Sequence, residues 1–251
     1  MNRAIETVQL CKSFGRLIVA DAIDFRMDVG ARHALIGPNG AGKTTFVNLV
    51  SGVLQPGSGR IMLADKDITV LKQDQRVKHG LVRTFQINAL FRRLSVLENV
   101  TLAIAEREGF AGDFIRPAGR YRAAIDEAYA LLEALGLAPE AMKPITDLAY
   151  GRQRITEIAV ALGLKPKVLL LDEPAAGVPT GEVGIIIEVI ERLPSNIAVL
   201  LIEHDMDLVF RIAKRITVLV GGRILIEGAP DMIAQDPKVR QVYLGERRQL
   251  C

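Results

Sequence analysis

The sequence is poor in several features that would indicate particular classes of protein. Its 251 residues include only two cysteines, Cys11 and Cys251, at opposite ends of the chain. Their separation fits no metal-binding or redox motif, so two free thiols are the simpler interpretation. No apolar run approaches the roughly 18 residues of a membrane-spanning helix, and the first ten residues carry charges where a signal peptide needs an apolar stretch. If the protein works at a membrane, we expect another polypeptide to cross it.

The excess of positive over negative charge is also small. Lys and Arg total 32 and Asp and Glu total 29, which leaves a net charge of only +3 without a block of like charges. Nothing here could serve as a nucleic-acid tail, so charge alone names no partner, and we expect none that is a nucleic acid. The chain contains no internal repeat, low-complexity tract or long Pro/Gly linker, and 49% of its residues are hydrophobic, enough to bury a core. These features predict one functional unit.

Short apolar runs rich in β-branched residues recur along the chain. They lie at 34–36, 168–171, 197–202 and 216–220, and helical patterns follow at 42–50, 181–193 and 205–213. This alternation is typical of a parallel sheet that helices cover. By contrast, the first thirty residues and 60–63 have the pattern of antiparallel strands. The predicted fold class is α/β, with a mostly parallel core sheet and an N-terminal antiparallel β subdomain.

The middle of the chain has a different pattern. Between Val96 and Leu162 it is nearly all helical, with a helix predicted from Tyr121 to Leu135 and ended by Gly136. We interpret this stretch as an α-helical lobe inserted into the sheet domain. The prediction is one domain over 1–251, with a core lobe at about 1–95 and 165–251 and a helical lobe at about 96–164.

A glycine-rich loop is the strongest local signal for chemistry. Its residues match the P-loop pattern and are Gly37, Pro38, Asn39, Gly40, Ala41, Gly42, Lys43 and Thr44, followed by Thr45. Such a loop turns its backbone N–H groups toward a phosphate, and the following helix adds the positive end of its dipole. We expect Lys43 to neutralise the β and γ phosphates of ATP and Thr44 to bind Mg²⁺. An ordinary strand-to-helix turn is the alternative, but the full pattern arises by chance in only about one such chain in a hundred.

Two acids, Asp172 and Glu173, follow the apolar run at 168–171. At the carboxyl end of a central strand beside a P-loop, carboxylates can hold a metal and act on water. We expect Asp172 to bind Mg²⁺ through water and Glu173 to polarise the attacking water. An isolated acid pair is more often a helix cap or a loop charge, so this prediction depends on the P-loop.

The segment Leu148, Ala149, Tyr150, Gly151 and Arg152 resembles the signature motif of ATP-binding cassette (ABC) proteins. This motif distinguishes the family among P-loop proteins, so the resemblance implies a P-loop NTPase with an inserted helical lobe. It also implies that two cassettes pack head to tail and that each signature loop contacts the γ phosphate held by its partner's P-loop. Without that context the segment would be an ordinary helix start with a glycine in the turn.

Three further residues fall where the family has functional side chains. Gln86 resembles the Q-loop glutamine that reaches the metal and the transmembrane partner, and residues 85–93 would line the groove for that partner's coupling helix. His204 resembles the switch histidine that contacts the γ phosphate, and Phe14 resembles the aromatic residue that stacks on adenine. The alternatives are a polar loop residue for Gln86, a structural histidine for His204 and a core side chain for Phe14.

The resemblance spans Ile5 to Gly245 and is strongest to the ATPase subunits of branched-chain amino acid uptake systems, on the segments 81–87, 172–177, 201–206 and 242–246. It implies an ATPase that uses ATP and Mg²⁺ at the cytoplasmic face of the inner membrane. Its partners would be transmembrane permease subunits and a second ATPase subunit, in a homodimer or a heterodimer. The expected cargo is branched-chain or related small amino acids or amides.

Three alternatives remain open at this point. A lipopolysaccharide-export ATPase has a similar Tyr-Leu-Gly-Glu ending, as at 243–246. A catalytically weak module that dimerises on ATP would be expected to lose Glu173 or His204, and both are present. Soluble cassette proteins that act on nucleic acid or ribosomes usually carry two cassettes or long coiled-coil insertions, and this chain has neither.

The sequence departs from the family pattern at three positions. Ala149 stands where many relatives have the signature serine, Arg152 replaces the usual glutamine, and Pro179 occupies the position of the D-loop aspartate. These changes affect the part of the composite site that is offered to a partner cassette. The site built on this chain's own P-loop keeps its motifs.

Overall fold

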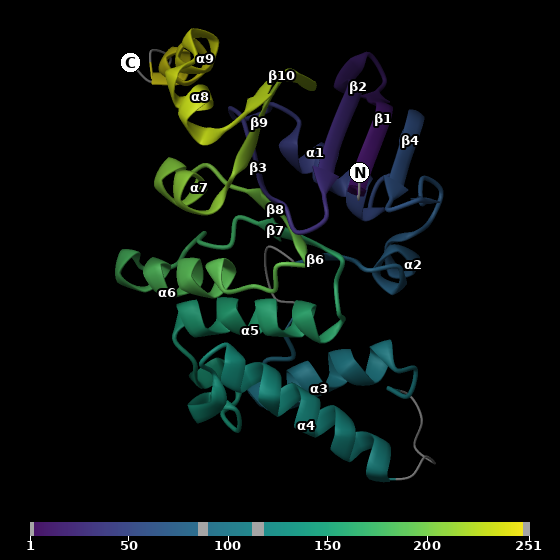
Figure 1. Cartoon of the computed structure of the whole chain (residues 1–251), viewed down its shortest axis with the longest axis vertical. Coiled ribbons are helices and arrows are strands. Elements are labelled where there is room, and N and C mark those ends of the chain that lie inside the picture. Colours follow the sequence, from purple (N-terminus) through teal and green to yellow (C-terminus); the bar gives the residue numbers. More distant parts are fainter. Residues whose placement is uncertain (1–2, 85–89, 112–117, 248–251) are drawn as a thin grey trace. The chain divides into compact units, whose positions relative to one another are not determined.

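The computed structural model describes residues 3–84, 90–111 and 118–247 (Figure 1). The chain forms two compact units: unit 1 comprises Met1–Leu81, Lys167–Glu173 and Pro194–Cys251, and unit 2 comprises Val82–Pro166 and Pro174–Leu193. Unit 2 therefore includes 82–95 and 174–193, which lie outside the range predicted for the helical lobe. The single functional domain with two lobes stays a prediction. Within the described ranges, no helix combines the length and the apolar character needed to cross a membrane.

An antiparallel sheet of unit 1 confirms the pattern predicted for the N-terminal residues. Its strand order is β2-β1-β4-β5, with β1 at Arg3–Phe14, β2 at Leu17–Asp28, β4 at Ser58–Leu63 and β5 at Lys66–Asp67. Strand β2 buries Ile23, Phe25 and Met27, two residues apart, on one face. The register against β1 shifts between Ala20 and Ile23, where Ala22 has a left-handed φ of 48°. A bulge at this point keeps the apolar side chains on the buried face.

The core sheet is mostly parallel, as predicted. Its strand order is β10-β9-β3-β8-β7-β6, with β10 at Arg223–Gly228, β9 at Arg215–Val220, β3 at Arg32–Ile36, β8 at Ala198–Ile202, β7 at Val168–Asp172 and β6 at Leu81–Arg83. Strand β3 runs parallel to β8 and β9, β7 runs parallel to β8, and β10 is antiparallel to β9. Every residue of β7 and β8 is buried. Their continuous apolar sequences fit strands that are covered on both faces.

The helices of unit 1 follow the strands in sequence. They are α1 (Lys43–Ser51), α2 (Gln73–Lys78), α7 (Met206–Ile212), α8 (Pro230–Gln235) and α9 (Pro237–Arg247). Helix α1 joins the core through Phe46, whose ring meets Phe25 of β2 edge-on at 5.4 Å between centroids. Each such buried aromatic side chain contributes roughly 1.5–3 kcal/mol. The core thus holds the helix that begins at the P-loop.

Unit 2 is helical and includes α3 (Val96–Arg107), α4 (Ala118–Ala134), α5 (Tyr150–Gly163) and α6 (Thr180–Glu191), with short 3-10 turns at Ala138–Glu140 and Ile145–Asp147. Helices α3, α4 and α5 pack together (Figure 1). A capping box between Ser95 and Glu98 starts α3. Helix α4 ends just before Gly136, whose φ of 71° is left-handed, and this confirms the predicted stop.

Candidate functional site

The glycine-rich loop lies between the end of β3 at Ile36 and the start of α1 at Lys43, as the sequence predicts. A Cβ atom at Gly37 would lie 2.2 Å from the carbonyl oxygen of Leu219. At Gly42, where φ is 100°, a Cβ atom would lie 2.6 Å from the carbonyl oxygen of Val19. Only glycine fits at either position. The loop is therefore held against the backbone of β2 and β9.

Lys43 folds back over this loop. Its Nζ donates hydrogen bonds to the carbonyl oxygens of Gly37 at 2.5 Å and Pro38 at 3.0 Å. Helix α1 has no side-chain cap and no acid in its first turn, which also contains Thr44 and Thr45. Its first N–H groups and the positive end of its dipole therefore face the loop with no carboxylate of that turn to neutralise them. The ammonium group and the helix end together suit an anionic phosphate.

Arg76, a residue to which the sequence assigned no role, supports the opposite end of α1. It is fully buried, and its guanidinium donates to the carbonyl oxygens of Leu49 and Val50, both at 2.7 Å. It also donates to Leu71 at 2.9 Å and Thr69 at 2.8 Å. A cation at a helix C-terminus complements the helix dipole. Arg76 therefore anchors the helix whose first turn carries Lys43.

Asp172 and Glu173 lie at the carboxyl end of β7, where the sequence places them. Asp172 is buried, with 7% of its surface exposed, and the backbone N–H of Glu173 donates to the carbonyl oxygen of Ile202 at 2.9 Å. Glu173 has a left-handed φ of 48°. A non-glycine residue in this conformation carries backbone strain, which is common at functional sites. The left-handed conformation of Glu173 turns the backbone directly after the last residue of β7, Asp172.

His204 lies beside Glu173 in unit 1. Its Nδ1 is 3.7 Å from Oε1 of Glu173, and 69% of the histidine side chain is exposed. This exposure argues against the structural histidine that was the alternative. The neighbouring Glu203, which was not predicted as a site residue, is 2% exposed and accepts a hydrogen bond from the backbone N–H of His204 at 3.0 Å. Glu203 thus fixes the turn that presents His204.

The signature segment lies at the start of α5 in unit 2. Leu148 is buried, and Ala149 is the N-cap residue of α5, without a side-chain hydrogen bond. The N–H of Gly151 instead donates to Oε2 of Glu182, in the first turn of α6, at 2.8 Å. Arg152 donates to the carbonyl oxygen of Gly136 at 3.0 Å. Glu182 was not predicted as a site residue, because its partner is a backbone group 31 residues away.

Phe14 and Gln86 are the two remaining predicted residues, and the structure describes only Phe14. Phe14 ends β1 with 51% of its surface exposed, so the alternative of a core side chain is wrong. The ammonium of Lys12 lies 5.5 Å from the centroid of its ring. Stacking on adenine stays a prediction. Gln86 lies outside the described residues, as does most of the segment 85–93.

The oxygen groups of Thr44 and Asp172 fit the chemistry of a magnesium site. Mg²⁺ prefers a few oxygen ligands from the protein, completed by water and substrate phosphates. Thr44 follows Lys43 in the first turn of α1, and Asp172 is the last residue of β7. Among the described residues there is no cluster of three His, Cys, Asp or Glu side chains arranged for a metal. A site of few protein ligands, with phosphates as the others, is the type that these residues suit.

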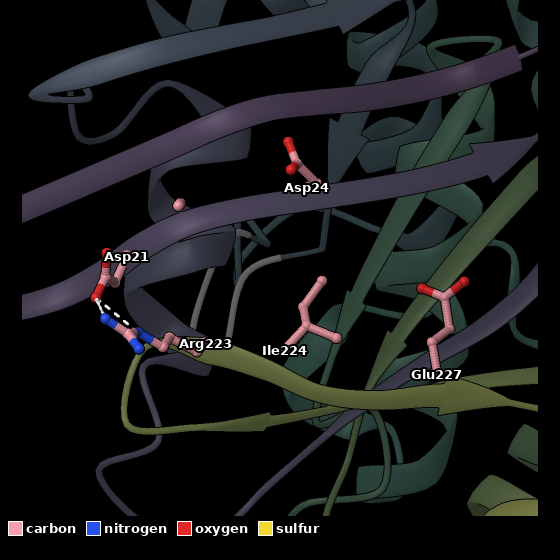
Figure 2. A pocket seen from close by; sticks show the side chains of 6 residues that line it. Asp21, Asp24, Arg223, Ile224 and Glu227 are labelled. Carbon is pink, nitrogen blue, oxygen red and sulfur yellow. Dashed lines mark hydrogen bonds and ion pairs between the residues drawn. The ribbon is translucent and has the colours of Figure 1, made fainter.

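A surface hollow of about 500 Å³ lies between β2 and β10 in unit 1 (Figure 2). Figure 2 shows Arg223 directed toward Asp21, and the guanidinium donates to that carboxylate at 2.7 Å through Nε. Asp24 accepts a hydrogen bond from the backbone N–H of Gln9 at 2.7 Å. None of the predicted site residues lines the hollow. Its charged side chains cover the neighbouring edges of the two sheets, which protects exposed strand edges from pairing.

The chain belongs to the ABC transporter family, whose sequence profile matches residues 20–176. The family, the fold class and the ATPase activity predicted from the sequence are thereby confirmed. A second profile, described as branched-chain amino acid ATP-binding cassette transporter, matches residues 223–248.

Similar proteins cover almost the full chain. LivG of Escherichia coli K12, a high-affinity branched-chain amino acid transport ATP-binding protein, is 39% identical over 94% of this chain and 96% of its own. BraF of Pseudomonas aeruginosa, described in the same words, is 39% identical over 98% of this chain and 100% of its own. The crystal structure of the ADP conformation of an ATP-binding cassette of an ABC transporter has a TM-score of 0.86 at 31% identity, over 98% of this chain and 100% of that one.

Proposed function

We propose that this chain is the ATP-hydrolysing subunit of an importer for branched-chain or related small amino acids or amides. It would act at the cytoplasmic face of the inner membrane, with transmembrane permease subunits and a second ATPase subunit. The observation that carries the catalytic part is in unit 1, where Lys43 folds over the P-loop and His204 lies 3.7 Å from Glu173. The cargo is proposed from the names of LivG and BraF and from the profile matched at 223–248.

The P-loop binds the triphosphate of ATP. Lys43 exchanges its contacts to the carbonyl oxygens of Gly37 and Pro38 for contacts to the β and γ phosphates, which are the stronger acceptors. The backbone N–H groups from Asn39 to Thr45 and the positive end of α1 add further donors and positive potential. Phe14, which is half exposed, offers a ring face on which adenine stacks.

Glu173 and His204 act on the γ phosphate. Glu173 accepts a hydrogen bond from the attacking water and orients it, while its left-handed backbone fixes the direction of the carboxylate. His204 contacts the γ phosphate, and Glu203 holds its backbone in place. Magnesium, when bound, would neutralise charge on the β and γ phosphates, and Thr44, Gln86 and Asp172, the last through water, would hold it. Positioning and charge stabilisation are the main contributions of a protein to phosphoryl transfer.

The signature segment 148–152 serves the ATP of a partner cassette. Helix α5 begins there, so its first N–H groups are donors for an anion. Ala149 offers no hydroxyl where many relatives have serine, and the backbone donors therefore carry more of the contact. The ATP-bound dimer closes, moves the permease subunits and reopens after hydrolysis.

The first test is magnesium-dependent ATP hydrolysis by the purified full chain and three variants. Glu173→Gln is expected to bind ATP while its turnover falls by at least about a hundredfold, since general base catalysis contributes 10²–10⁴-fold. Lys43→Ala is expected to lose ATP binding. Glu188→Gln is the control, because Glu188 is an exposed residue of α6 that is 3.8 Å from Arg192. A wild-type chain that binds ATP without turnover would contradict the catalytic proposal and favour a dimerisation module.

The cargo needs a separate test in cells. Deletion of the gene is expected to abolish high-affinity uptake of labelled leucine, isoleucine and valine, and the wild-type gene is expected to restore it. Glu173→Gln should fail to restore uptake, while Glu188→Gln should succeed. Unchanged amino acid uptake in the deletion strain would reject this cargo and leave the ATPase assignment intact.

A further inference from the structure

The carboxylate of Glu182 occupies the position of a missing helix cap. A serine at the N-cap of a helix accepts a hydrogen bond from an N–H of the first turn, but the N-cap of α5 is Ala149, which makes no such bond. Oε2 of Glu182 accepts this bond instead, from the N–H of Gly151 at 2.8 Å. Glu182 therefore supplies from α6 the acceptor that position 149 lacks.

The contact between Gly151 and Glu182 depends on the backbone of both residues. A Cβ atom at Gly151 would lie 2.5 Å from Oε2 and 3.2 Å from Cβ of Glu182, so only glycine allows the carboxylate to approach this far. The backbone N–H of Glu182 donates to the carbonyl oxygen of Pro179 at 2.8 Å, which fixes the residue in the first turn of α6. One carboxylate thus lies at the N-terminal ends of both α5 and α6, where negative charge is stabilised.

Further contacts join α5 to the loop that precedes α6. Arg154 of α5 donates to the carbonyl oxygen of Ala176 at 3.3 Å and to the hydroxyl of Tyr150 at 2.9 Å. The Tyr150 ring lies so near Gly177 that a Cβ atom there would be 3.3 Å from its hydroxyl oxygen. The loop at 174–179, which leads into α6, therefore rests on the first turn of α5. A movement of the Glu182 carboxylate can occur while Arg154 and Tyr150 keep this loop in place.

We propose that Glu182 is a positioning residue, which holds the Gly151 N–H in the open cassette and releases it when two copies of this chain close on ATP. The proposal rests on the proposed function, in which the signature loop contacts the γ phosphate bound by the partner. The Gly151 N–H cannot donate fully to a carboxylate and a phosphate at once, and two anions at one donor repel each other. Closure therefore requires Glu182 to move away.

The test compares Glu182→Ala and Glu182→Gln in the full chain, each combined with Glu173→Gln to prevent turnover. Size-exclusion light scattering with increasing ATP gives the dimer dissociation constant, and thermal unfolding without ATP gives Tm. Glu182→Ala is expected to tighten the ATP-dependent dimer about tenfold, since a hydrogen bond to a charged group no longer has to break. Glu182→Gln should be intermediate, because its amide oxygen still accepts the bond without the charge.

The two measurements are expected to move in opposite directions. Loss of the cap should lower Tm by about 2–4 °C, while the dimer becomes tighter. The control Glu188→Gln, in the same helix, should change neither. An ATP-dependent dimer that is unchanged or weaker in Glu182→Ala overturns the proposal, because a cap with a purely structural role would give that result. Absence of a dimer in every variant also overturns it, whereas loss of hydrolysis by the chain with intact Glu173 would be a failure of the proposed function.

Discussion

Replacement of Arg76 by methionine removes the guanidinium at the C-terminal end of the P-loop helix while it keeps much of the buried aliphatic volume. The side chain is fully buried, and its four hydrogen bonds of 2.7–2.9 Å all go to backbone carbonyl oxygens. Burial lowers the pKa of Arg76 to about 10, and the nearby Asp67 raises it, so the group stays charged at neutral pH. The variant therefore loses a cation that the fold uses as a hydrogen-bond donor.

The expected effect is a large loss of stability. Each buried acceptor left without a partner costs about 1–3 kcal/mol, and two of the four acceptors, on Leu49 and Val50, belong to the last turn of α1. Allowing for partial relaxation, we expect the free energy of unfolding to fall by about 4 kcal/mol, a large share of the 5–15 kcal/mol typical of a domain. Arg76→Lys keeps the charge but has one nitrogen for four acceptors, so about half of that loss is expected.

Urea unfolding followed by circular dichroism measures this loss. Lys78→Met is the matched control, since Lys78 is an exposed cation of the same helix, α2, and its replacement should change stability by less than about 0.5 kcal/mol. The Michaelis constant for ATP should also rise in Arg76→Lys, because α1 carries Lys43 and Thr44 in its first turn. An Arg76→Met chain within about 1 kcal/mol of wild type would refute the view that these bonds anchor α1.

Two further predictions concern buried polar side chains. Burial lowers the pKa of His33 to about 4 from 6.5, although Glu227 raises it, so the unfolded chain binds a proton in this range that the folded chain does not. The free energy of unfolding therefore falls as the pH falls from 6.5 toward 4, by about 2 kcal/mol between pH 7 and pH 5. In urea titrations at these two pH values, His33→Gln should lose distinctly less stability than wild type. An equal loss would contradict the view that His33 causes this pH dependence. Asn99 bonds the N–H of Phe91 at 2.8 Å and the carbonyl oxygen of Ser95 at 2.9 Å. Asn99→Ala should cost about 2 kcal/mol and speed amide hydrogen exchange at Phe91, and unchanged exchange there would exclude this role.

The elements that the sequence predicts correctly are those with a local signal. The P-loop is a run of consecutive residues, and β7 and β8 are unbroken apolar runs that stand out from their flanks. Strand β10 and helices α8 and α9 were not predicted. No residue of β10 is fully buried, and α8 is a six-residue helix in which Ile233 is the buried residue, so neither has a run of buried apolar residues. A local sequence pattern identifies an element best where all of its residues are buried.

Arg76, Glu203 and Glu182 could not be found in the same way. Each forms hydrogen bonds with backbone groups. The sequence does not show which backbone carbonyl oxygen or N–H a side chain will meet, because almost every residue carries both. Arg76 lies in a polar stretch that predicts an exposed helix face, yet its partners Leu49 and Val50 are 27 and 26 residues away. Such side chains become recognisable only when the fold brings the backbone group to them.

The three departures from the family pattern are each accommodated within unit 2. Glu182 caps the helix at which Ala149 lacks a hydroxyl, and Arg152 finds the carbonyl oxygen of Gly136. Pro179 is the N-cap of α6 with a φ of −56°, a value that proline adopts without strain. These residues therefore leave the fold of the cassette undisturbed, and their effect must lie in what the loops offer to a partner. Ala149 offers no hydroxyl there, and the Glu182 carboxylate already accepts the Gly151 N–H. Under the proposed function, the departures should therefore change the strength of the ATP-bound dimer more than the stability of the chain.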